Sequence, residues 1–102
     1  MWYLVMSRIS GDPQRIYETL NDHLAWMKKM HDAGKILFSG PTPDHSIGII
    51  VVKEDSLDSA RHMMDREPWI ANGLREYEIF EWDVHQIMGV GSFTAAELRA
   101  HR

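Results

Sequence analysis

Two side chains that can move protons, His23 and Glu67, stand out in the sequence. His23 lies in a segment, residues 13–34, whose apolar residues recur with helical spacing. At about 100° per residue, the histidine falls within an apolar arc of roughly 80°. The same arc holds Ile16, Leu20, Met27 and Met30. The pattern predicts an amphipathic helix that carries an imidazole on its inner face.

A buried imidazole needs a hydrogen-bond partner, because leaving a buried polar group unpaired costs about 1–3 kcal/mol. Glu67 is the leading candidate, since Pro68 and Trp69 hold its backbone rigid and extended just beyond a second predicted helix. Asp65 is the second choice. A carboxylate would orient the ring and leave its other nitrogen free as a general base or acid. Two plainer interpretations stay open: His23 as a hydrogen-bonded core residue, and Glu67 as a surface carboxylate.

Five further residues are candidates for substrate binding. Ser39 and Gly40 precede a proline, and the turn predicted there could donate hydrogen bonds to negative charge that develops on a substrate oxygen. A serine in this position is also common turn chemistry without a functional role. Trp26, Phe38 and Trp69 could line an aromatic pocket, although core packing is the preferred interpretation of such residues.

Strand and helix signals alternate along residues 1–83. Asp12 and Pro13 are typical of a helix start, Gly34 is typical of a helix end, and Ser56 is a helix cap. The expected elements are a strand over 2–9, a helix over 13–34, strands over 35–39 and 47–53, a helix over 57–66 and a strand over 75–83.

This βαββαβ order predicts an α+β, ferredoxin-like fold: a four-stranded antiparallel sheet with both helices on one face. Three of the strands are apolar on both alternating sets of positions, so the open sheet face also needs a cover. A second subunit is the simplest one, which predicts a homodimer or a higher homo-oligomer. Residues 84–102 form a C-terminal tail that could pack on the partner.

Composition excludes several classes of protein. A chain of 102 residues is one domain, and its formal net charge of −4, without a block of Lys or Arg, argues against a nucleic-acid surface. No apolar run is long enough to cross a membrane, and we expect a cytoplasmic protein. The absence of Cys excludes disulfides and thiolate chemistry.

The sequence predicts neither a metal site nor a cofactor. The histidines other than His23 are scattered singly, so no pair stands three or four residues apart on one helix face. A single His could still serve as a haem ligand, and that alternative stays open. No glycine-rich phosphate loop is present.

Several of these residues, in this order, resemble the YciI-like family of the dimeric α/β-barrel superfamily. The anchors are His23 in the first helix, Gly34, the Ser-Gly-Pro run at 39–41, and residues 67–74, Glu-Pro-Trp-Ile-Ala-Asn-Gly-Leu, which are similar to the family's Asp-Pro-Phe-x-x-x-Gly-Leu signature. The family's proposed active site is a His with an Asp, which maps onto His23 and Glu67. Here Glu replaces Asp and Trp69 replaces Phe, so the chain departs from the pattern at both positions.

The resemblance implies a homodimer that acts on a small oxygenated ring, as do dehydrochlorinases of chlorinated hydroxyquinols and muconolactone isomerases. Our hypothesis is a cofactor-independent lyase or isomerase in which His23 is the acid/base and Glu67 orients it. A non-catalytic module that binds a small ligand or stabilises an assembly is the alternative. A cofactor-free quinol monooxygenase is a second alternative.

Overall fold

The computed structural model describes residues 1–86, and these form the predicted α+β fold. The tail predicted over 84–102 lies almost wholly outside the described residues. In residues 1–86 no helix is both long and apolar enough to cross a membrane. The elements are β1 (Trp2–Ile9), α1 (Pro13–Glu18), α2 (Leu20–Asp32), β2 (Ile36–Pro41), β3 (Gly48–Lys53), α3 (Leu57–Asp65), α4 (Pro68–Ala71) and β4 (Arg75–Trp82).

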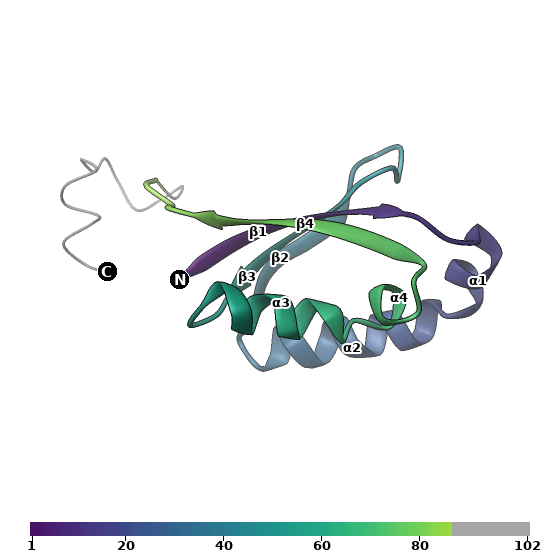
Figure 1. The fold of residues 1–102 in the computed structure, drawn as a ribbon, viewed down its shortest axis with the longest axis horizontal. Helices are drawn as coiled ribbons and strands as arrows, with labels where there is room; N and C mark the ends of the chain where they lie inside the picture. The colour runs from purple at the N-terminus through teal and green to yellow at the C-terminus, as the bar shows by residue number, and fades with distance from the viewer. Residues whose placement is uncertain (87–102) are drawn as a thin grey trace.

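The four strands form one antiparallel sheet in the order β2-β3-β1-β4. The strands that follow the two crossovers, β2 and β4, therefore lie at the two edges of the sheet. All the helices cover the same face of the sheet (Figure 1). The expected topology, including the hairpin of β2 and β3, is confirmed.

The helix predicted over 13–34 is divided in two at Thr19. The Thr19 hydroxyl donates to the carbonyls of Arg15, at 2.6 Å, and of Ile16, at 3.4 Å. The Ile16 carbonyl also accepts a hydrogen bond from the indole of Trp69, at 3.2 Å. Side-chain donors thus occupy carbonyls of the last turn of α1, which interrupts the helical ladder there. As predicted, Asp12 caps α1, Ser56 caps α3, and Gly34 is left-handed with a φ of 74°.

The apolar core lies between the sheet and the helices. It is built from the helix-facing side chains of the sheet and the inner faces of α2 and α3: Tyr3, Val5, Met27, Ile36, Ile50, Val52, Ala60, Met63 and Met64. The opposite sheet face carries large apolar side chains that stay exposed, with Phe38 at 66%, Phe80 at 47% and Trp82 at 43%. In residues 1–86 no element covers this face (Figure 1).

Candidate functional site

His23 and Glu67 form the hydrogen-bonded pair that the sequence predicts. The Nδ1 atom of His23 lies 2.6 Å from Oε1 of Glu67, and their side chains are 18% and 3% exposed. His23 comes from the first turn of α2, and Glu67 from the segment that joins α3 to α4. In residues 1–86 no side chain or backbone group is hydrogen-bonded to Nε2 of His23. One ring nitrogen is therefore held by the carboxylate while the other is available to a ligand.

Glu67 is held in place by the short helix α4, which the sequence analysis did not predict. Its backbone is extended, with φ −61° and ψ 129°, and its side chain caps the helix by accepting hydrogen bonds from the backbone N–H groups of Trp69 and Ile70. These two bonds reach Oε2, at 3.1 and 3.2 Å, while Oε1 faces the imidazole. An ionised carboxylate accepts all of these bonds, so the hydrogen of the His23 pair lies on Nδ1. Pro68 at the first helical position is the sequence signal for α4.

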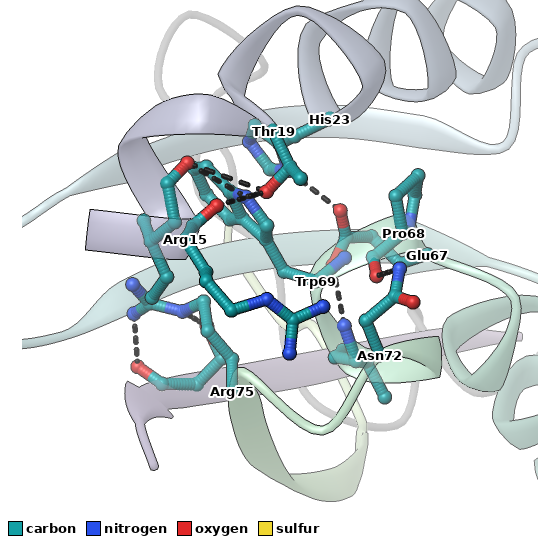
Figure 2. A network of polar contacts seen from close by, with 11 residues as sticks. Arg15, Thr19, His23, Glu67, Pro68, Trp69, Asn72 and Arg75 are labelled. Carbon is teal, nitrogen blue, oxygen red and sulfur yellow. Dashed lines mark hydrogen bonds and ion pairs between the residues drawn. The ribbon is translucent and has the colours of Figure 1, made fainter. Parts of the chain in front are cut away.

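The indole of Trp69 packs flat on the His23 ring, with centroids 3.6 Å apart and planes 8° from parallel. Its Nε1–H donates to the Ile16 carbonyl, at 3.2 Å, and to the Thr19 hydroxyl, at 3.0 Å. Figure 2 shows the result: Trp69 is tied to the junction of α1 and α2 while Glu67 reaches the imidazole from α4. Residues from three helices therefore fix the orientation of one ring.

The pair opens into a cavity of about 510 Å³ between the helices and the sheet. Most of its wall is apolar, and the polar side chains in it belong to Ser7, His23, Ser39, His45, Glu67, Trp69 and Arg75. A volume of this size is typical of a site for a small organic molecule. The wall offers an acid–base group, a cation and hydroxyls within one largely apolar space.

Ser39 and Gly40 also line this cavity, but they do not form the predicted turn. Both lie within β2, opposite Ile50 and Ile49 of β3, because the strand continues to Pro41. The Ser39 hydroxyl is 2.9 Å from Nε2 of His31 on α2. The expectation of a turn at Ser39 and Gly40 is therefore wrong, although both residues line the same cavity as the pair.

Two of the aromatic candidates lie outside the cavity. Trp26 lines a separate hollow between α2 and α3, together with Asp58, His62 and Arg66. Phe38 is on the open face of the sheet, because an irregularity between Ile36 and Phe38 reverses the side on which the following residues point. Among the three aromatic candidates in the described range, Trp69 is thus the one placed beside His23.

The second-choice partner of His23, Asp65, is engaged elsewhere. Its Oδ1 accepts a hydrogen bond from the Tyr77 hydroxyl, at 2.7 Å. Burial and this bond raise the pKa of Tyr77 to about 12. In residues 1–86 no group of three or more His, Asp or Glu side chains is arranged to hold a metal ion.

Sequence reasoning missed Arg75, the first residue of β4. Its guanidinium lines the cavity and donates to Ser7 through Nε, 3.0 Å from the hydroxyl, and through Nη2, 2.9 Å from the carbonyl. Its Cζ lies 5.8 Å from the Trp69 ring centre. Burial lowers the pKa of Arg75, and the charge of Glu67 opposes that shift. The signal was available, because strand alternation places Arg75 on the same sheet face as the partly buried Tyr77 and Ile79.

The fold and the site together define a ferredoxin-like α+β protein with a His–carboxylate pair in a cavity between sheet and helices. More particularly, the chain belongs to the family of the YCII-related domain, whose model matches residues 1–83. The comparison with curated proteins finds no match.

Two solved structures share the fold. One is 5-chloro-2-hydroxyhydroquinone dehydrochlorinase from Burkholderia phenoliruptrix AC1100, in complex with 2,5-dihydroxybenzoquinone; it is 20% identical, with a TM-score of 0.68 over 80% of this chain and 93% of that one. The other is a muconolactone isomerase, 12% identical, with a TM-score of 0.68 over 91% of this chain and 98% of that one.

Proposed function

We propose that this protein is a cofactor-independent lyase or isomerase of small hydroxylated or chlorinated ring compounds, with His23 as its acid/base. The observation that carries the proposal is the 2.6 Å contact of His23 with Glu67 at the wall of a cavity of about 510 Å³. The dehydrochlorinase and the isomerase that share the fold support this substrate class, because the names of both describe small oxygenated substrates.

The geometry assigns a role to each atom of the pair. With its proton on Nδ1, His23 presents the lone pair of Nε2 to the cavity and takes a proton from a ring carbon or hydroxyl. The imidazolium that forms is stabilised by the buried carboxylate of Glu67. Returning the proton to another carbon migrates the double bond, whereas departure of chloride with its bonding electrons completes the loss of HCl.

The cavity wall assists by binding the substrate. The 3.6 Å stack on Trp69 fixes the plane of the His23 imidazole. The indole also offers an apolar edge to the ring of the substrate. Ser39 lines the same space, and its hydroxyl donates a hydrogen bond to a substrate oxygen as negative charge develops there. Gly40 beside it also lines this space.

We further propose that two copies pair through the open sheet face. Leu4, Val51, Phe80 and Phe38 form one cross-strand row on that face. Phe38 and Phe80, at the two ends of this row, are 66% and 47% exposed, and such exposed apolar side chains are typical of a surface that another protein covers. A second copy is the occupant that would close two sheets into one barrel, as in the dimeric α/β-barrel proteins with the same fold.

The test is turnover by the whole protein of a chlorinated hydroxyquinol and of a muconolactone, followed by chloride release and by ultraviolet absorbance. His23→Gln should lower turnover about 100-fold or more, because a positioned acid/base supplies that much rate. His62→Gln, on α3 and away from the pair, is the matched control and should leave the rate unchanged.

Three other outcomes would contradict the proposal. Equal rates for both variants would remove His23 from the chemistry. Binding of these compounds without turnover would favour a non-catalytic ligand-binding module. Oxygen consumption that depends on His23 would favour a quinol monooxygenase.

A further inference from the structure

Arg75 is a cation in the cavity wall without a carboxylate hydrogen-bonded to it in residues 1–86. The acidic side chain whose charge acts on it is Glu67. That carboxylate is already committed, through Oε1 to His23 and through Oε2 to two backbone N–H groups. A partly buried charge is costly unless it is paired. The Arg75 guanidinium would therefore be stabilised by an anionic ligand in the cavity.

Ser7 fixes the direction of this guanidinium. It is 6% exposed, and it accepts from Nε with its hydroxyl and from Nη2 with its carbonyl. Arg has five N–H donors in a planar fork, so three of them remain unused in the described part of the chain. Of these three, one N–H group on each Nη atom lies at the outer end of the guanidinium. This pair of donors matches the two oxygens of a carboxylate.

Gly48, at the start of β3, leaves room for this arrangement. A Cβ atom on Gly48 of β3 would lie 3.0 Å from the Ser7 hydroxyl and 3.4 Å from Nη2 of Arg75. Any side chain at this position would therefore press on the anchored guanidinium. A glycine inside a strand, where it packs poorly, is consistent with a close approach that the site requires.

Arg75 and His23 can contact the same molecule, because both line the cavity of about 510 Å³. The imidazole centre lies 3.6 Å from the centre of the indole, and the guanidinium carbon lies 5.8 Å from it. Figure 2 shows Arg75 on the strand side and Glu67 on the α4 side of Trp69. A ring compound in the cavity can therefore place one end at the guanidinium and present a proton to the imidazole.

We propose that Arg75 binds a carboxylate of the substrate, so that the substrates of this protein are small ring carboxylic acids. This inference specifies the substrate class of the acid–base site proposed above and rests on it. Arg75 acts as a binding and specificity residue, and Ser7 is its positioning residue. The carboxylate holds the ring in one orientation while His23 transfers the proton.

The experiment compares the binding of benzoate with that of its neutral isostere benzamide to the whole chain, by NMR titration of the Trp69 indole N–H signal. We expect benzoate to bind at least about tenfold more tightly than benzamide, because its charge-assisted contacts need Arg75. Arg75→Gln should remove this preference. Arg66→Gln, which deletes an exposed arginine at the end of α3, is the matched control and should keep it.

Further variants keep the test decisive. If Arg75→Gln fails to fold, Arg75→Lys should retain part of the preference for benzoate, and Ser7→Ala should reduce it. Equal affinities of the unaltered protein for benzoate and benzamide would overturn the proposal, as would equal losses in the Arg75 and Arg66 variants. His23→Gln should keep the preference. If His23 is not the acid/base, the turnover assay shows it, and the preference for benzoate over benzamide is unchanged.

Discussion

The indole of Trp69 lies 3.6 Å from the imidazole of His23, with the two ring planes 8° from parallel. The hydrogen bond to Glu67 fixes the rotation of the imidazole about its own axis, and the stack fixes its plane. Neither contact alone would hold Nε2 in one direction. A proton-transfer group has to be positioned in this way before substrate arrives, because a small misplacement costs much of the rate.

Replacing Trp69 with Phe should destabilise the protein by about 1 kcal/mol. The phenyl ring can still stack on His23, but the indole hydrogen bonds to Ile16 and Thr19 are lost. Urea unfolding, followed by circular dichroism, measures the difference in free energy. Trp2→Phe on the open sheet face is the control, and an equal loss there would show that the bonds to the α1–α2 junction contribute nothing.

Replacing Glu67 with Ala should cost about 2–3 kcal/mol of stability, because both the cap of α4 and the partner of His23 disappear. Asp65→Ala, a short distance away, removes one bond at an exposed site and should cost less than about 1 kcal/mol. The same unfolding assay measures both variants. Comparable losses would mean that the buried carboxylate has no special structural role.

The pairing of His23 with Glu67 could be predicted because each residue has a strong local signal. Helical periodicity places His23 on the inner face, and Pro68 fixes an extended backbone at Glu67. The two segments then meet in one layer of the predicted fold. The strand order and the uncovered sheet face followed from the same short-range patterns.

The rest of the site depends on contacts that local patterns do not contain. The stack of Trp69 on His23 joins residues 46 positions apart in the sequence, and the same indole reaches the Ile16 carbonyl at the break between α1 and α2. Phe38 was misplaced because a single irregularity in β2 inverts the side-chain alternation. Trp26 follows His23 by one helical turn, yet the packing of α2 on α3 places it in another hollow.

Replacing Phe80 with Glu should convert the proposed dimer into a monomer. Phe80 is 47% exposed on the open sheet face, opposite Leu4 of β1. A carboxylate there would have to be buried unpaired at the centre of the interface. Sedimentation velocity measures the mass of each form. Tyr17→Glu, at an exposed residue on α1, is the control and should keep the dimer; a monomeric unaltered protein would contradict the proposed pairing.

Stability should fall between about pH 10 and pH 12 because of Tyr77. Burial and the hydrogen bond to Asp65 raise the pKa of this phenol from 10.0 to about 12 in the folded protein. Between these values the unfolded chain has released the proton and the folded chain still holds it. Unfolding is then accompanied by proton release, so rising pH favours the unfolded state.

The contribution of Tyr77 is therefore fully present below about pH 10 and is lost as pH rises through about 12. Urea unfolding at intervals across this range measures the slope, and Tyr77→Phe should make it shallower because the titrating group is gone. Tyr17→Phe, at an exposed tyrosine, serves as the control for other groups that titrate in alkali. If Tyr77→Phe and Tyr17→Phe give the same slope, the bond to Asp65 does not hold the phenol proton in solution.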